Sequence, residues 1–236
     1  MRKLIPILLI GTLALAASPS KYSKIVKSSE RRARIAVIDT GLDLTDPRFR
    51  DVLCSDGHLD LTGQRMYDRN GHGTHVAGII AEHLNDKTKV CLMIIKYYTA
   101  SQTGRVNLIK EVQAIEHATR YGAKIMNLSL DGPESDLDEK YAIAGSSATF
   151  VVAAGNEDKQ YLGYSYPGSY RLPNIKVVGN WDCKNQKKGF KANYGDDVIW
   201  RCGTDIESTA PGGGRVKMSG SSMAAPLLTA ELANKL

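Results

Sequence analysis

Continuous apolar runs and amphipathic segments alternate along most of the chain. Four continuous runs, rich in β-branched residues, are typical of strands buried on both faces of a parallel sheet, and they occupy 34–39, 90–96, 124–130 and 148–154. Apolar residues at helical spacing predict a helix beginning near His72 and helices over 106–121 and 134–144. Shorter strands are expected at 175–179 and 198–201, with a last helix from Ser222 onward.

This alternation predicts a parallel sheet with right-handed crossovers, which is an α/β fold. The chain of 236 residues is 42% hydrophobic and 24% charged, an ordinary globular composition without internal repeats or low-complexity blocks. We therefore expect one domain over 34–236, preceded by a short polar leader at 17–33.

The first sixteen residues have the pattern of a secretory signal peptide. Arg2 and Lys3 precede an apolar run over 4–17, and Ala14-Leu15-Ala16 has the small residues of a cleavage site. The run is short for a membrane span, which needs about 20 residues, so no membrane association is expected after signal removal. The mature chain is expected to be secreted or periplasmic and monomeric.

Charge and cysteine content narrow the function classes. Loss of the signal peptide lowers the formal net charge from +6 to +4, and the basic residues accompany no nucleic-acid motif, so no nucleic-acid partner is expected. The four cysteines of an exported chain favour two disulfides, at Cys54, Cys91, Cys183 and Cys202. None belongs to a C-x-x-C pair, which disfavours zinc.

Small residues surround two hydroxyls near the C-terminus, in Ser219-Gly220-Ser221-Ser222-Met223-Ala224-Ala225-Pro226. A sharp entry into a helix suits a nucleophile, because free N–H groups and the helix dipole favour developing negative charge there. We interpret Ser222 as that nucleophile, although a serine pair before a helix taken alone is more often a cap.

Two further segments supply the partners that a nucleophilic serine needs. Asp39 ends the first predicted strand, at the sheet edge where α/β proteins place their chemistry. His72, between two glycines at a helix start, suits a proton carrier near neutral pH. Asp39-Thr40-Gly41 also fits an aspartic protease, but that reading requires a homodimer because the motif occurs once. Metal ligation by His72 and His75 lacks a third ligand, and His75 is interpreted as structural.

Asn156 follows the buried strand at 148–154 in Ala153-Ala154-Gly155-Asn156. Alone it is best explained as a turn residue, but its amide can also donate hydrogen bonds to an oxyanion.

Together these segments resemble the subtilisin-like serine proteases. The aspartate motif Ala36-Val37-Ile38-Asp39-Thr40-Gly41, the histidine motif Gly71-His72-Gly73-Thr74-His75 and the serine motif Gly220–Pro226 follow the family's order Asp, His, Ser. The resemblance covers roughly 34–228 and implies a three-layer α/β/α fold. It also implies a serine endopeptidase with Asp39, His72 and Ser222 as catalytic triad, and Asn156 with the Ser222 N–H as oxyanion hole.

The resemblance implies further features of the site. The substrate peptide is expected to lie along Ser129, Leu130, Asp131 and Gly132, with Ala153, Ala154 and Gly155 completing the pocket for the residue before the cut. Many relatives carry Gly at the position of Asp131, and an acid there favours a basic substrate residue. From the family's sheet order we expect disulfides Cys54–Cys91 and Cys183–Cys202.

No metal or cofactor is expected. The family's tight calcium site uses an aspartate shortly after the catalytic one and a long loop after the histidine helix. Here Arg48 aligns with that aspartate, and 82–89 is too short for the loop.

Two alternatives from other classes stay open. The chain fits an inactive, peptide-binding relative, which reactivity of Ser222 would exclude. It also fits an ester hydrolase, although the G-x-S-x-G elbow of lipases is absent.

Overall fold

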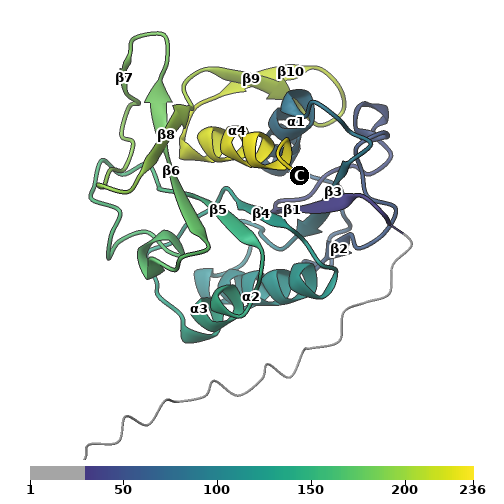
Figure 1. Ribbon diagram of the computed structural model, residues 1–236, viewed down its shortest axis with the longest axis horizontal. Coiled ribbons are helices and arrows are strands. Elements are labelled where there is room, and N and C mark those ends of the chain that lie inside the picture. Colours follow the sequence, from purple (N-terminus) through teal and green to yellow (C-terminus); the bar gives the residue numbers. More distant parts are fainter. Residues whose placement is uncertain (1–29) are drawn as a thin grey trace, which may run out of the picture.

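The fold is built on an eight-stranded sheet in the order β2-β3-β1-β4-β5-β6-β7, with β8 beside β6 (Figure 1). The computed structural model describes residues 30–236, so the predicted signal peptide and residues 17–29 of the leader lie outside the described residues. The strands are β1 (Ala33–Asp39), β2 (Leu59–Asp60), β3 (Val90–Lys96), β4 (Ile125–Leu128), β5 (Thr149–Ala153), β6 (Ile175–Asp182), β7 (Lys187–Lys188) and β8 (Ile199–Cys202). Only the β6–β7 pair is antiparallel among the paired strands of this sheet in 30–236.

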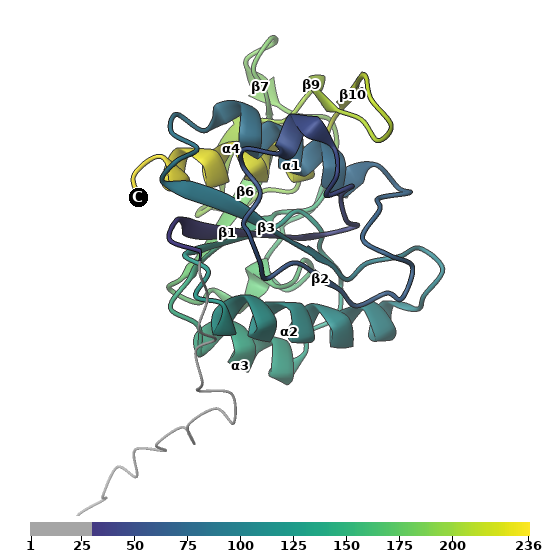
Figure 2. The ribbon, with the colours of Figure 1, turned by 90° about the vertical axis from the view of Figure 1, so that its right-hand side faces the viewer.

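Helices cover both faces of the sheet and make three layers (Figures 1 and 2). One face carries α1 (His72–His83) and α4 (Ser221–Ala233), and the other carries α2 (Gly104–Arg120) and α3 (Leu137–Ala144). Successive side chains of a strand point to opposite faces, so Ile35 and Val37 pack with α1 and α4 while Ala36 and Ile38 pack with α2 and α3. The predicted three-layer α/β/α architecture is confirmed.

Side-chain caps fix the helix starts at positions that differ from the predicted ones. Thr103 accepts a hydrogen bond from the Val106 N–H at 3.4 Å, so α2 begins at Gly104. Asp136 accepts from the Asp138 and Glu139 N–H groups at 2.9 and 3.1 Å, so α3 begins at Leu137 instead of 134. A side chain that satisfies the free N–H groups of a first turn decides the boundary more sharply than apolar spacing does.

An antiparallel hairpin of β9 (Ile206–Thr209) and β10 (Arg215–Met218) was not expected from the apolar pattern. The Nε2 of His75 lies 3.0 Å from the carbonyl oxygens of both Ile206 and Val216, so a buried side chain of α1 attaches this hairpin to the domain. This contact supports the structural interpretation of His75. Within residues 30–236, none of the helices is both long and apolar enough to cross a membrane.

Two disulfides connect neighbouring segments, in the pairing expected above. One joins Cys54 to Cys91 on β3, and the other joins Cys183 to Cys202 on β8. Each closes a loop in the unfolded chain and typically stabilises by about 2–4 kcal/mol.

Two buried carboxyl groups lie together between α2 and α3. Burial, reinforced by the charge of Glu139, raises the pKa of Glu111 well above its usual range. Burial also raises the pKa of Glu139 to about 7, although a hydrogen bond donated by the Tyr170 hydroxyl at 2.6 Å opposes this rise. The folded state therefore binds protons that the unfolded chain releases above its ordinary glutamate pKa.

This pair predicts a stability that falls as the pH rises from about 4.5 through about 7. Glu111→Gln removes one of the two ionising groups. The Tm of the variant should therefore rise relative to that of the wild type between pH 5 and pH 8. Thermal unfolding at both pH values measures this, with exposed Glu134→Gln as control. A Tm difference between Glu111→Gln and wild type that stays constant with pH would contradict it.

Candidate active site

Asp39 and His72 meet at the carboxyl edge of the sheet. Asp39 is the last residue of β1 and His72 the first of α1, and His72 Nδ1 lies 2.8 Å from Asp39 Oδ1. The same carboxylate oxygen accepts the Thr40 N–H at 2.7 Å. Asp39 is 1% exposed and the His72 side chain 18%, so the carboxylate is enclosed while the imidazole reaches the surface.

Close packing of α1 on the turn after β1 makes this contact possible. A Cβ on Gly73 would lie only 2.6 Å from the Gly41 carbonyl oxygen, so glycine is required at that position. Burial alone would lower the pKa of His72, but the charge and hydrogen bond of Asp39 and the charge of Asp68 outweigh it and raise that pKa. Nδ1 is therefore held as the donor, which leaves Nε2 as the nitrogen that can accept a proton.

The two adjacent serines of α4 have different environments. Ser221 is fully buried and its hydroxyl accepts the Gly155 N–H at 3.2 Å, whereas Ser222 is half-buried in the first helical turn. Within residues 30–236, neither Ser222 Oγ nor His72 Nε2 has a hydrogen-bond partner. Hydrogen bonds between catalytic side chains are often long without substrate and shorten only when substrate binds. Of the two hydroxyls, Ser222 is the accessible one.

Asn156 contacts the start of α4. Its Oδ1 accepts the Ser221 N–H at 2.9 Å. Because this donor requires the oxygen of the amide, the Nδ2 group faces away from Ser221, and within residues 30–236 no acceptor is found for it. In the first turn of α4 the Met223 N–H donates to the Gly220 carbonyl oxygen at 3.0 Å, whereas no partner is found for the Ser222 N–H among the described residues. The Ser222 N–H and Asn156 Nδ2 are therefore the two donors that remain at this place.

The predicted substrate segments lie at the ends of two neighbouring parallel strands, β4 and β5. Ser129 is buried just after β4, and Gly132 pairs with Tyr166 through hydrogen bonds of 3.1 and 2.8 Å. Ala153 and Ala154 are buried at the end of β5. Leu130 is partly buried against the core on the α2–α3 face.

Two carboxylates approach each other at Gly155. A Cβ on Gly155 would lie 2.7 Å from Glu157 Oε2 and 2.8 Å from Asp131 Oδ2. The second of these oxygens accepts the Ser165 hydroxyl at 2.8 Å, while Glu157 Oε2 accepts from Asn193 Nδ2 at 2.7 Å. The sequence interpretation identified Asp131 but missed Glu157, Ser165 and Asn193, whose separation along the chain gives no local signal.

Restricted hydration of its carboxyl group changes the acidity of Asp131. Although Asp131 keeps part of its surface exposed, desolvation of its carboxyl raises the pKa to about 6. The Ser165 hydrogen bond opposes the rise and the Glu157 charge adds to it. No lysine or arginine among the described residues forms an ion pair with either carboxylate.

The residues at the family's calcium position do not fit that ion. Arg48 forms an ion pair with Asp46 at 2.5 Å and donates to the carbonyl oxygens of Ala210 and Gly214 at 2.8 and 2.9 Å. The guanidinium thus takes the carboxylate and carbonyl oxygens that a calcium ion would need. In the described part of the chain, the one group of potential metal ligands is Glu30 with Cys54 and Cys91, whose sulfurs form a disulfide.

We therefore predict that excess calcium leaves the thermal stability of the mature protein nearly unchanged. Thermal unfolding in excess calcium and in excess chelator measures the difference directly. A calcium-dependent rise above about 10 °C would contradict the prediction, because it corresponds to several kcal/mol of ligand binding in a domain of this size.

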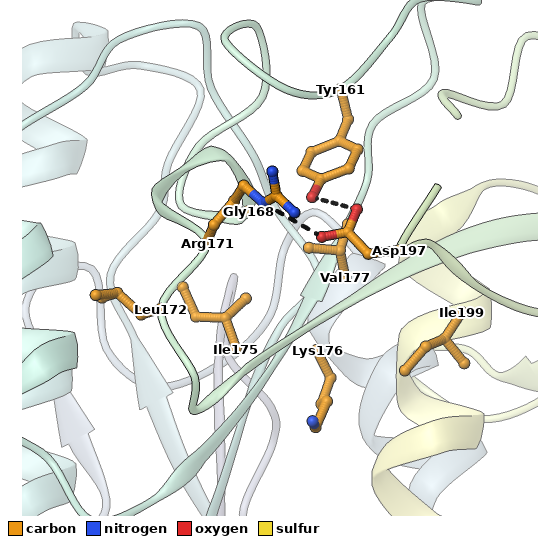
Figure 3. Close-up of a pocket in the computed structure, with 9 residues that line it drawn as sticks. All are labelled: Tyr161, Gly168, Arg171, Leu172, Ile175, Lys176, Val177, Asp197 and Ile199. Atoms are coloured by element: carbon orange, nitrogen blue, oxygen red, sulfur yellow. Dashed lines mark hydrogen bonds and ion pairs between the residues drawn. The ribbon is translucent and has the colours of Figure 1, made fainter. Parts of the chain in front are cut away.

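A separate pocket of about 260 Å³ contains none of these residues (Figure 3). Figure 3 shows Tyr161 and Arg171 turned toward the same carboxylate, Asp197. The Tyr161 hydroxyl donates to Asp197 at 2.7 Å and the Arg171 guanidinium lies 3.7 Å away. These polar groups are satisfied by one another, so we assign the pocket no role.

Comparison with known proteins identifies the family that the chain resembles. Residues 30–235 match the Subtilase family. An "Intracellular serine protease" of Paenibacillus polymyxa is 33% identical over 219 residues, which are 86% of this chain and 66% of that protein. "Subtilisin Savinase" of Lederbergia lenta is 36% identical over 205 residues, 82% of this chain and 72% of that protein.

A solved structure supports the same assignment. The crystal structure of a cold adapted subtilisin-like serine proteinase matches with a TM-score of 0.71 at 26% identity, covering 86% of this chain and 75% of that one. The chain spans just under two thirds of the length of the Paenibacillus relative. With the family match over nearly all described residues, the chain belongs to the subtilase family.

Proposed function

We propose that this protein is a secreted serine endopeptidase with Asp39, His72 and Ser222 as its catalytic triad. The observation that carries the proposal is the Asp39–His72 hydrogen bond of 2.8 Å in a subtilase whose accessible serine, Ser222, lies in the first turn of α4. The signal-like residues 1–16 and the two disulfides favour export to an oxidising compartment. We also propose that the mature protein acts as a monomer without cofactor or nucleic-acid partner.

The triad divides the chemistry among its members. Ser222 Oγ attacks the scissile carbonyl carbon while His72 Nε2 takes the hydroxyl proton. The imidazolium returns that proton to the leaving amine, which departs as the acyl-enzyme forms. Asp39 holds the ring with Nδ1–H as donor and stabilises its positive charge. Water then hydrolyses the ester by the same steps in reverse.

Two donors are proposed to stabilise the tetrahedral oxyanion. Asn156 Nδ2 faces away from Ser221, and the Ser222 N–H belongs to the first turn of α4. Their placement before substrate binds is what makes such donors effective, because no reorganisation is needed as charge develops.

The substrate peptide is proposed to bind as an added strand along Ser129, Leu130 and Asp131. Gly132 is left out of this pairing, because its N–H and C=O groups are already bonded to Tyr166. Main-chain pairing gives affinity that is tolerant of sequence, and the pocket for the residue before the cut gives selectivity. Ala153, Ala154 and Gly155 form the opposite wall of that pocket, and Asp131 and Glu157 place two carboxylates beside it.

This acidic pair predicts a preference for Lys or Arg before the scissile bond. We expect kcat/KM for such a peptide to exceed that of the Leu counterpart by roughly 10-fold or more, which is about 1.4 kcal/mol. The preference should grow as the pH rises through about 6, where Asp131 becomes charged. Asp131→Asn should reduce it, and exposed Asp138→Asn serves as control. Equal rates for Lys and Leu peptides at pH 8 would contradict it.

Digestion of an unfolded protein substrate tests the proposed function. We expect internal cleavage, with new N-termini identified by mass spectrometry, and a matched Ser222→Ala preparation should produce none. Hydrolysis of small esters without any peptide cleavage would favour the ester-hydrolase alternative. Tight peptide binding without hydrolysis of either would favour an inactive relative.

A further inference from the structure

Asp68 is a buried carboxylate that precedes the histidine motif and has no assigned role. It is 1% exposed. Its two oxygens accept five hydrogen bonds, from Thr40 Oγ1 (2.9 Å), Asn70 N (3.0 Å), Gly71 N (2.9 Å), Thr74 N (2.8 Å) and Thr74 Oγ1 (2.8 Å). Four of the five donors belong to residues 70–74, so one side chain organises the segment that contains His72.

The charge of Asp68 has no salt-bridge partner among residues 30–236. Burying a carboxylate is costly unless hydrogen bonds replace its hydration, and the five donors do so here. A carboxamide offers one acceptor oxygen in place of two, so it could not accept from both Gly71 and Thr74 as the two oxygens of Asp68 do. The same five bonds that hold this turn therefore place a carboxylate next to His72.

Thr40 connects this carboxylate to both partners of the Asp39–His72 pair. Its hydroxyl donates to Asp68 Oδ1 and accepts the Gly73 N–H at 2.8 Å, while its own N–H donates to Asp39 Oδ1. Displacement of Asp68 would loosen the start of α1 and the Asp39 carboxylate together.

The elements around His72 also contain ionisable groups, on β1, on α1 and on β3. Asp39 contacts it from β1, and His75 follows one turn later on α1 with its Nε2 turned to the hairpin. Lys96 on β3 donates its Nζ to the Tyr67 carbonyl oxygen at 2.7 Å, next to Asp68 in the chain. Asp39 and Asp68 are the two carboxylates whose charges raise the pKa of His72.

We propose that Asp68 is a positioning residue for His72, which fixes the turn that presents the imidazole and whose fixed negative charge stabilises the imidazolium formed during catalysis. The catalytic part of this inference rests on the proposed function. The effect of the Asp68 charge on the pKa of His72 can be measured whether or not the protein hydrolyses peptides.

The test measures the titration of His72 by NMR in wild type and Asp68→Asn, with the signal assigned by its loss in His72→Ala. We expect the pKa of His72 to fall by roughly half a unit or more in Asp68→Asn. The acid limb of kcat/KM against pH should move the same way, and the plateau should fall roughly tenfold or more. Asp182→Asn is the matched control, because Asp182 is also a buried carboxylate that accepts turn N–H groups, at 3.1 and 3.0 Å.

An unchanged His72 titration in folded Asp68→Asn would overturn the inference. If Asp68→Asn shifts the titration of His72 but the wild-type protein hydrolyses no peptide, only the proposed function is overturned. If Asp68→Asn does not fold, Thr40→Val and Thr40→Ser provide the second comparison. Thr40→Val should lower kcat/KM with little change in the His72 pKa, and Thr40→Ser should restore the rate. Full activity of Thr40→Val would contradict the positioning role.

Discussion

Ser222→Ala is expected to lower the turnover of a peptide substrate by about 10⁴- to 10⁶-fold while the protein remains folded. The loss is expected to be large because the hydroxyl is the proposed attacking group. Ser221→Ala is the matched control, since Ser221 is buried and accepts the Gly155 N–H. Its substitution should cost far less, because the backbone N–H that Asn156 accepts is retained.

The other members of the triad should behave as one unit with Ser222. His72→Ala is expected to match Ser222→Ala, and the double variant should be no worse than either alone. Asp39→Asn should cost about 10⁴-fold, because an amide stabilises the wrong imidazole tautomer. Steady-state kinetics on one peptide measures all of these, with circular dichroism as the check of folding. Near wild-type turnover in folded Ser222→Ala, or inactivation by Ser221→Ala alone, would contradict the assignment.

Asn156→Ala is expected to lower kcat by about 10²- to 10³-fold with little change in KM. The amide donor strengthens only as the carbonyl oxygen becomes negative, so its loss affects the transition state more than the bound substrate. Asn156→Asp keeps the oxygen that accepts the Ser221 N–H but replaces the donor with a carboxylate. We expect it to be at least as impaired as Asn156→Ala.

Steady-state kinetics of both Asn156 variants and of exposed Asn85→Ala as control tests this role. An Asn156→Asp enzyme with wild-type kcat would show that the side chain only supports the α4 turn. A rise in KM without loss of kcat would place Asn156 in ground-state binding instead.

The elements that could be predicted from sequence are those with a local cause. The apolar run of β3 is buried along its whole length, so its burial is visible in its composition. The β9–β10 hairpin has exposed and half-buried positions in both strands, and its attachment depends on His75 from a distant helix. The spacing of apolar residues along the sequence does not predict a contact of this kind.

The residues of the candidate site also fall into those that local sequence predicts and those that only the fold identifies. Asp39, His72 and Ser222 stand in short motifs whose small neighbours indicate chemistry. The serine motif already favours Ser222 over Ser221, and the fold adds a physical reason, because Ser221 is buried and accepts the Gly155 N–H. Asp68 likewise appears as an ordinary turn aspartate until its bond to Thr40, 28 residues earlier in the chain, is seen.

Covalent labelling with a fluorophosphonate probe tests the central claim most directly, because the probe reacts with an activated serine and not with an ordinary hydroxyl. We predict one adduct on the folded mature protein, located at Ser222 by peptide mapping. The adduct should be absent in Ser222→Ala and form much more slowly in His72→Ala. No adduct on the folded wild-type protein, or an adduct at another serine that persists in Ser222→Ala, would contradict the account.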